Sequence, residues 1–202
     1  KNTEKILVVC VNNKLQKLNY RIYSPNTVEF LDINTTNGRR MYAFSLMFML
    51  SRAVKELYPE SELYIQHSMS DGYFCEINNL EESMPQVIGK LKERMCRMVE
   101  ENIPFLRKIV PVAEAAELFE RLGMKEKAEL IRNSNRLYAN VDLLGEVVNM
   151  FFFELVPSTA YLKVFDLYAF DDGFILQMPS KEDPSQTPKQ HTKDLKLFSI
   201  FR

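Results

Sequence analysis

The sequence predicts an α+β fold, because stretches typical of strands lie near both ends of the chain and stretches typical of helices lie between them. The 202 residues are 46% hydrophobic and 26% charged, which suffices for one large domain or two small ones with real cores. A doubly wound parallel sheet would instead alternate strands and helices regularly. We therefore expect small sheets and grouped helices.

Short apolar runs predict the first strands. Residues 6–11 are rich in β-branched side chains, and Asn12-Asn13 is typical of a turn that leads into Lys14-Leu15. Residues 27–33 partly alternate apolar and polar side chains, as a half-buried strand does. Residues 34–38 are expected to form a polar linker to the first helix.

Helices and one hairpin are expected in the middle of the chain. Residues 38–59 are typical of one long helix, and residues 63–67 and 73–77 of a hairpin that turns at residues 70–72. Ser83 and Gln86 form a capping box for a second helix with one apolar stripe. Its members are Met84, Val87, Ile88, Leu91, Met95, Met98 and Val99. Two shorter helices are expected over residues 111–122 and 125–132, separated by Gly123.

The last part of the chain is expected to be rich in strands from Val147 onward. The runs that indicate this are residues 151–153, 161–165 and 173–178. Residues 179–196 are typical of a linker, because prolines are scattered among polar side chains. Residues 193–198 are expected to begin a further element.

Composition excludes several classes of function. The net charge of −1 and the isoelectric point of about 6.2 give no overall electrostatic case for binding nucleic acid or a membrane surface. Three separated cysteines indicate a reducing, cytoplasmic setting without disulfides. No P-loop for ATP and no zinc-binding cluster of histidine and cysteine is present in the sequence. No signal peptide or membrane span is indicated.

Several segments resemble known modules. Residues 11–15 and 28–32 resemble the second half of a TGS domain, a small β-grasp module. Residues 38–59, 71–74 and 101–105 then follow the editing domain of threonyl-tRNA synthetase in order. The resemblance implies a TGS-like part over residues 1–33 and an editing-like α+β domain over residues 34–178.

A narrower resemblance concerns the last third of the chain. Residues 152–167 and 171–176 resemble the N-terminal region of bacterial uridine kinase-like proteins, in which synthetase-like modules precede a P-loop kinase. Residues 179–202 would then be a linker toward a kinase domain beyond this chain. The resemblance implies that the full-length protein phosphorylates a nucleoside or similar hydroxyl substrate with ATP and Mg. It implies no cofactor for this fragment.

The editing site of the synthetase family is degenerate in this chain. Its His-x-x-x-His pair matches Phe44 and Phe48, and its Cys-x-x-x-His element matches Phe151 and Leu155. The family aspartate matches Asn149, the pocket tyrosine matches Phe74, and only the family lysine is retained, as Lys127. Phenylalanine and leucine can neither hold a water molecule nor move a proton, so we expect no catalytic residues and no metal.

Two interpretations of Phe44 and Phe48 stay open: core packing, which their spacing of four residues favours, and a re-lined apolar pocket. Lys127 is typical of a solvated helix lysine. We interpret the fragment as a non-catalytic binding or regulatory domain. Its own kinase domain is the first expected partner, and a nucleoside or RNA is a further candidate. The alternatives are an RNA- or tRNA-binding module and a residual aminoacyl-ester hydrolase acting through Lys127.

Overall fold

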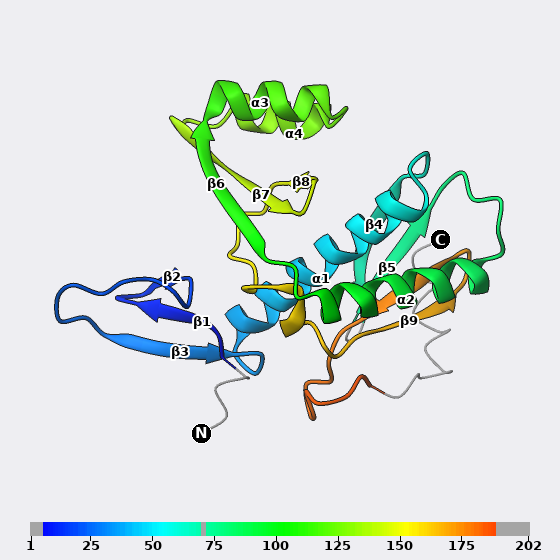
Figure 1. The fold of residues 1–202 in the computed structure, drawn as a ribbon, viewed down its shortest axis with the longest axis horizontal. Coiled ribbons are helices and arrows are strands. Elements are labelled where there is room, and N and C mark those ends of the chain that lie inside the picture. The colour runs from blue at the N-terminus through cyan, green and yellow to red at the C-terminus, as the bar shows by residue number, and fades with distance from the viewer. Residues whose placement is uncertain (1–5, 70–71, 189–202) are drawn as a thin grey trace.

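The computed structural model describes residues 6–69 and 72–188. Along the chain, helices and strands follow in a mixed order (Figure 1). They are β1 (Ile6–Val11), β2 (Lys14–Gln16), β3 (Val28–Asp32), α1 (Thr36–Leu57), β4 (Leu63–Met69), β5 (Gly72–Ile77), α2 (Met84–Glu101), β6 (Phe105–Pro111), α3 (Val112–Arg121), α4 (Lys125–Arg132), β7 (Tyr138–Leu144), β8 (Val147–Asn149), the 3-10 turn η2 (Thr159–Tyr161), β9 (Asp166–Phe170) and β10 (Gly173–Gln177).

The strands of the described residues form three small sheets, in the orders β2-β1-β3, β4-β5-β10-β9 and β6-β7-β8. Neighbouring strands pair antiparallel in all three. The sequence predicted an α+β fold with small sheets and grouped helices, and this mixture is confirmed; within the described residues no parallel sheet forms. The first sheet uses only residues 6–32, and the second joins the hairpin β4-β5 to the last two strands of the chain.

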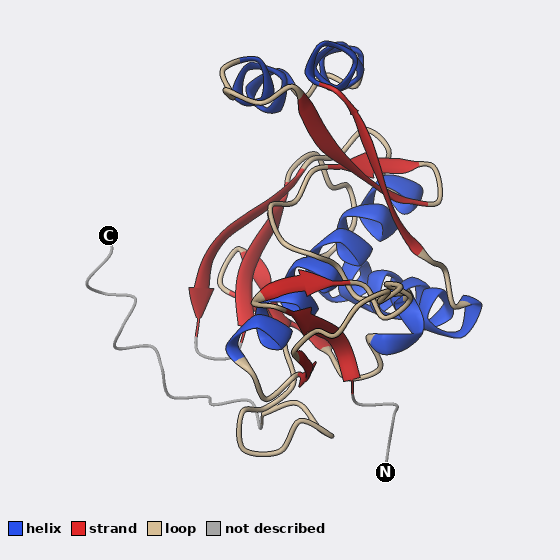
Figure 2. Ribbon diagram, turned by 90° about the vertical axis from the view of Figure 1, so that its left-hand side faces the viewer, coloured by secondary structure: helices blue, strands red, loops and turns tan. Residues whose placement is uncertain are grey.

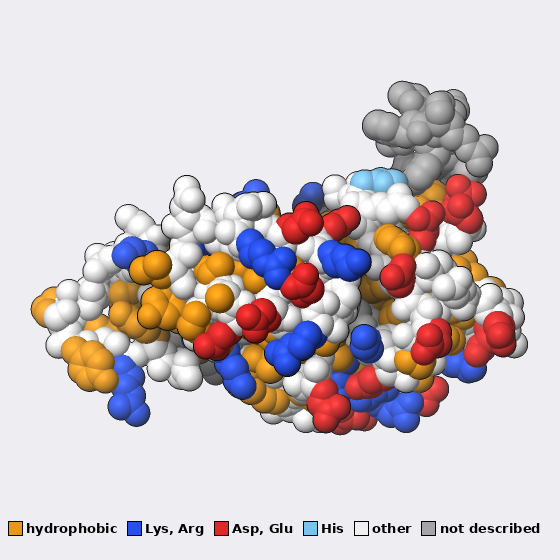
Figure 3. All heavy atoms as spheres, turned by 90° about the horizontal axis from the view of Figure 1, so that it is seen from above, with side chains coloured by type: hydrophobic (Ala, Val, Ile, Leu, Met, Phe, Trp, Pro, Cys, Tyr) orange, Lys and Arg blue, Asp and Glu red, His pale blue; other side chains and the backbone are white. Residues whose placement is uncertain are grey.

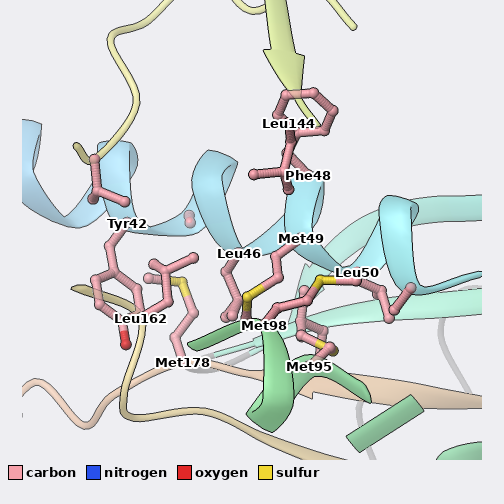
Figure 4. Close-up of a cluster of buried hydrophobic side chains, with 14 of the residues drawn as sticks. Tyr42, Leu46, Phe48, Met49, Leu50, Met95, Met98, Leu144, Leu162 and Met178 are labelled. Atoms are coloured by element: carbon pink, nitrogen blue, oxygen red, sulfur yellow. The ribbon is translucent and has the colours of Figure 1, made fainter. Parts of the chain in front are cut away.

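Helix α1 runs through the middle of the molecule and is buried on several sides. Its N-cap Thr35 accepts a hydrogen bond from the backbone N–H of Gly38 at 3.1 Å, so the helix begins at Thr36 rather than at residue 38. Met49 and Leu50 lie toward Met95 and Met98 of α2, whereas Phe48 lies toward Leu144 of β7 (Figure 4). A helix that is apolar around most of its circumference is typical of a core element.

The second helix matches its predicted pattern closely. Gln86 Oε1 accepts from the backbone N–H of Ser83 at 3.3 Å, which is one half of the expected capping box. The middle of the predicted stripe is buried in the main core, while its two end members, Met84 and Val99, are partly buried. Asn102 ends the helix in a left-handed conformation, with φ of 52°.

Helices α3 and α4 form a separate packing unit at the far end of the β6–β7 ribbon, where Figure 2 shows them side by side. Both helices were predicted from the sequence, and both lie within two residues of the expected bounds. Their small cluster contains Ala115, Ala116, Phe119, Ala128, Ile131 and Val141, and it is distinct from the main core.

Several strands differ from those expected from the sequence. Residues 151–153 and 161–165 form no strand, whereas β6, β7 and β9 were not predicted. The carbonyls of Phe151 and Phe153 accept hydrogen bonds from a side chain, Arg107, which replaces a strand partner. The further element expected at residues 193–198 lies outside the described residues. No helix in the described part of the chain is long and apolar enough to cross a membrane.

Replacing Tyr42 with phenylalanine is expected to destabilise the protein by about 1–3 kcal/mol. The buried Tyr42 hydroxyl donates to the carbonyl of Val164 at 2.9 Å and accepts from the Val164 N–H at 3.1 Å, so its removal leaves both backbone groups without that partner. Burial also raises the pKa of Tyr42. Urea unfolding measures the change. Tyr23→Phe is the control, because Tyr23 is 85% exposed, and equal stability of the two variants would contradict the expectation.

Candidate functional site

Phe44, Phe48 and Phe151, three of the residues matched to the family site, lie between α1 and one face of the β6-β7-β8 sheet. Arg107 pairs with Asp142 across β6 and β7, and Asp142 pairs with Asn149 across β7 and β8. Residues in register share one face of a sheet, so these three side chains form a polar row. The segment 150–155 leaves β8 and passes between this row and the helix, where four hydrogen bonds join it to Arg107 and Asp142.

Five aromatic rings fill the space between the helix and this segment. We call Phe44, Phe48, Phe105, Phe151 and Phe153 the phenylalanine cluster. The rings of Phe44 and Phe153 stack with centroids 5.3 Å apart and an interplanar angle of 9°. The rings of Phe48 and Phe151 are 5.3 Å apart, and those of Phe48 and Phe105 are 5.9 Å apart. Such pairs stabilise packing beyond their buried area.

Phe48 packs in the core and does not line an open pocket. Its side chain has no exposed surface, and Leu155 is also buried in the main core. Phe44 and Phe151 are partly buried, with their rings 5.8 Å apart. The structure thus brings Phe44, Phe48 and Phe151 together, with the Phe48 side chain closed off from solvent.

Arg107 holds the segment that carries Phe151. Its Nε lies 2.7 Å from Asp142 Oδ1, its Nη1 lies 2.7 Å from Glu154 Oε1, and its Nη2 donates to the carbonyl of Phe153 at 2.6 Å. Burial alone would lower the pKa of Arg107, but the two carboxylates raise it, so the side chain stays charged. Asp142 is only 1% exposed. We call Arg107, Asp142 and Glu154 the Arg107 clamp.

Lys127 is not the solvated surface residue that its helical position suggested. Its Nζ donates to Asn149 Oδ1 at 2.5 Å, and the same oxygen accepts from the backbone N–H of Met150 at 2.8 Å. Lys127 reaches Asn149 from α4, next to β8, the edge strand of its sheet. The structure therefore brings together two residues that the synthetase resemblance had assigned to one site. Burial lowers the pKa of Lys127.

Lys127 is expected to lose its proton at a lower pH than the ordinary lysine pKa of 10.5, because burial disfavours the charged form. A lowered pKa in the folded protein means that protonation favours unfolding, so this lysine adds stability as the pH rises from its folded pKa toward 10.5. Lysine side-chain NMR measures the titration, and Lys127→Arg identifies the signal. A pKa of Lys127 at or above 10.5 would contradict this.

Phe74 lies apart from the phenylalanine cluster. Its neighbour Cys75 is buried in the main core that includes α1, and successive side chains of a strand point to opposite faces. The ring of Phe74 accordingly packs on the other face of the sheet. Its centroid lies 5.7 Å from that of the His67 ring and 6.2 Å from that of the Phe170 ring. The resemblance assigned Phe74 to the same site as Phe44, Phe48 and Phe151, but the structure does not bring its ring into contact with theirs.

A cleft of about 480 Å³ opens at the start of α1, with Arg39, Arg40 and Lys181 among its lining residues. Arg39 donates to the carbonyl of Pro179 at 2.8 Å, and the Arg40 guanidinium lies 5.6 Å from the ring centre of Phe153. Both arginines are thus engaged with the protein itself. Among residues 6–69 and 72–188, no group of three or more His, Cys, Asp or Glu side chains could hold a metal ion.

The Arg107 clamp is the part of the site that sequence reasoning missed. One signal was available for Asp142, a single carboxylate inside the apolar run 141–144. A charge in such a run is a candidate for a buried ion pair, because an unpaired buried carboxylate would be costly. Nothing comparable marks Arg107, which is followed by another cation, Lys108.

Comparison with known proteins gives one consistent result. The chain is 27% identical to a threonine--tRNA ligase of Carboxydothermus hydrogenoformans over 165 residues, 81% of this chain and 26% of the relative. It is 31% identical to that of Desulforamulus reducens over 121 residues, 60% of this chain and 19% of the relative. It is 29% identical to that of an Azoarcus species over 161 residues, 78% of this chain and 25% of the relative.

No protein-family model matches the chain. The chain spans about a quarter or less of the length of the curated relatives named above. The similarity to threonine--tRNA ligases extends over most of this chain and supports a threonyl-tRNA synthetase-like domain.

Proposed function

We propose that this chain is a non-catalytic, editing-like binding domain that regulates or assembles a larger cytoplasmic protein. The observation that carries the proposal is Phe48, which stands where the synthetase resemblance places a catalytic histidine and is fully buried in the phenylalanine cluster. Ester hydrolysis needs a positioned water and a group that can take its proton. The hydrocarbon rings of the phenylalanine cluster supply neither.

The larger protein, in this proposal, is a uridine kinase-like phosphotransferase, and the chain's main partner is its kinase domain. ATP and Mg would then bind that domain and not these residues, in agreement with the lack of a P-loop in the sequence. The first sheet would be the TGS-like part, and residues 179–202 would lead to the kinase. Nucleosides are the small-molecule ligands to test first, since they are the implied kinase substrates.

A deacylation assay tests the lack of catalysis. The 202-residue chain is incubated with charged tRNAs, tRNAThr carrying correct and incorrect amino acids among them, and release of the amino acid is followed over time. We expect the rate of the buffer control. Release above that rate that disappears in Lys127→Ala would overturn the proposal in favour of a residual hydrolase, because Lys127 is the one matching residue retained from the family site.

The role as a binding domain has its own test. The chain is titrated with the separately expressed kinase portion of the full-length protein and, in parallel, with nucleosides. Saturable binding of either supports the proposal. The face seen from above carries interspersed positive and negative side chains, with hydrophobic ones gathered toward the end that bears the first sheet (Figure 3). A gel shift with tRNA that weakens with salt, together with no binding to the kinase portion, would contradict this proposal and favour an RNA-binding role.

A further inference from the structure

The two faces of the β4-β5-β10-β9 sheet differ in what they contact. Cys75 and Leu176, on its central strands, belong to the main core together with residues of α1 and α2. Successive side chains of a strand point to opposite faces, so Phe74 and Ile175, which are paired in register, lie on the other side. Edge strand β9 adds two aromatic residues to that side. We call it the outer face, and its members are Phe74, Tyr168, Phe170 and Ile175.

The outer face is apolar and lies outside both clusters of buried residues. Phe74 is 5% exposed and Ile175 is 1% exposed, yet neither belongs to the main core or to the cluster of α3 and α4. Tyr168 and Phe170 are half-buried. A contiguous apolar surface of this kind is stabilised when a further apolar segment packs on it.

The last described residue of the chain lies at this face. Gln177 follows Ile175 by two positions on β10 and therefore shares its side of the sheet. The buried Gln177 side chain donates from Nε2 to the carbonyl of Pro188 at 3.0 Å. The Oε1 of the same amide group is buried and has no hydrogen-bond partner among residues 6–69 and 72–188. A buried amide oxygen is nearly always paired, and the residues that directly follow Pro188 carry the nearest backbone N–H groups in the chain.

The sequence after Pro188 contains a segment that fits this face. Five of the seven residues 195–201 are apolar, and they are Leu195, Leu197, Phe198, Ile200 and Phe201. An extended chain advances about 3.3 Å per residue, so the seven positions from residue 188 to residue 195 span up to about 23 Å. Neighbouring strands lie about 4.8 Å apart, which makes a four-stranded sheet about 15 Å wide. The segment can therefore reach every strand of the outer face.

The charges of the sheet and of the segment are complementary. In sequence, the four strands and the turn at residues 171–172 contain no lysine or arginine and four carboxylates, on Glu76, Asp166, Asp171 and Asp172. Residues 189–202 contain four lysine or arginine residues and one aspartate. Opposite charges attract the segment to this sheet and disfavour a basic competitor surface.

We propose that residues 195–201 dock on the outer face, with their apolar side chains against Phe74 and Ile175. Docking would fix the place where residue 202 leaves the domain, so residues 179–202 would hold a set position instead of acting as a flexible linker. The inference goes beyond the proposed function, because it requires neither a kinase domain nor the loss of catalysis. The deacylation assay and the test below can therefore fail independently.

Phe198→Trp makes the segment its own reporter, because the chain contains no tryptophan. In the folded 202-residue variant, we expect the introduced indole to emit at a shorter wavelength than in urea. We also expect acrylamide to quench it several-fold less than in urea, since docking shields it from water. Both quantities are expected to be independent of protein concentration.

A charge on the outer face is expected to release the segment. Phe170→Asp is added to Phe198→Trp, and emission and quenching are expected to approach their values in urea while the melting temperature shows that the domain stays folded. Ala169→Asp is the matched control, because Ala169 is the exposed neighbour on β9 and points to the opposite side. It is expected to leave the indole protected.

A second measurement locates the segment without altering the sheet, in case Phe170→Asp does not fold. The photoreactive p-benzoylphenylalanine replaces Phe198, and mass spectrometry maps the crosslinks, which are expected in β5, β9 and β10. Crosslinks confined to other elements would overturn the proposal, as would an indole that is as accessible in the folded chain as in urea. Protection that persists in folded Phe170→Asp would overturn it too. Protection that is lost on dilution, with a dimer in sedimentation, would assign the outer face to a second copy of the chain instead.

Discussion

Replacing Arg107 with alanine is expected to destabilise the protein by about 3–5 kcal/mol, the effect typical of removing one partner from a buried ion pair. The change leaves Asp142, 1% exposed, without its cation, and it removes the donor to the carbonyls of Phe151 and Phe153. Both consequences act on the same segment. Urea unfolding measures the loss, and near-ultraviolet circular dichroism reports whether the aromatic packing changes with it.

Arg97→Ala is the matched control for this change. Arg97 is an exposed helix residue whose nearest carboxylate, on Glu93, lies 3.8 Å away, and pairs of this kind contribute about 0.2–1 kcal/mol. The double variant Arg107→Ala with Asp142→Ala is expected to be less destabilised than the sum of the two single changes, because the second change removes the buried charge that the first left unpaired. Additive effects, or a loss no larger than that of Arg97→Ala, would show that the Arg107 clamp does not hold the segment.

Replacing Phe48 with alanine is the second change with a large expected effect, a loss of about 3–5 kcal/mol. Phe48 has no exposed surface and contacts the rings of Phe105 and Phe151, so truncation leaves a cavity between α1 and the sheet. Phe152→Ala is the control, because its side chain is 72% exposed. Urea unfolding compares the two variants.

The Phe48 variant also tests what the cluster does. If the phenylalanine cluster is core, Phe48→Ala lowers the free energy of unfolding while Phe152→Ala leaves it nearly unchanged. If Phe48 instead lined a ligand site, its truncation would change stability little in the ligand-free protein. A loss below about 1 kcal/mol would therefore favour a re-lined pocket over core packing.

Elements whose signals are local could be predicted from the sequence. The capping box at Ser83 and the apolar stripe of α2 depend on neighbours within one or two helical turns. Residues 6–11 are rich in β-branched side chains, which indicates a strand without knowledge of its pairing partner. Strands β6 and β7 were missed because their site-facing side includes Arg107 and Asp142. A half-buried strand is recognised by apolar residues that alternate with polar ones, and charged residues are taken to face solvent. A buried ion pair places charged residues at the buried positions, so the alternation is lost.

The candidate site was predictable in its helical half and much less in its other half. Phe44 and Phe48 are four positions apart, which places them on one side of α1 whatever the rest of the chain does. The contact between Lys127 and Asn149 joins residues far apart in the chain, across the edge of a sheet that was itself not predicted. Residues 151–153 read as strand-forming because of their three phenylalanines, yet a guanidinium satisfies two of their carbonyls.

The separate cluster of α3 and α4 implies that the protein is not one cooperative unit. Among residues 6–69 and 72–188, a two-strand ribbon and its short third strand connect that cluster to the main core. Amide hydrogens of these two helices should therefore exchange through a partial opening that leaves α1 and α2 folded. Each opening would separate Lys127 from Asn149 and break their hydrogen bond. The phenylalanine cluster would stay packed during the opening.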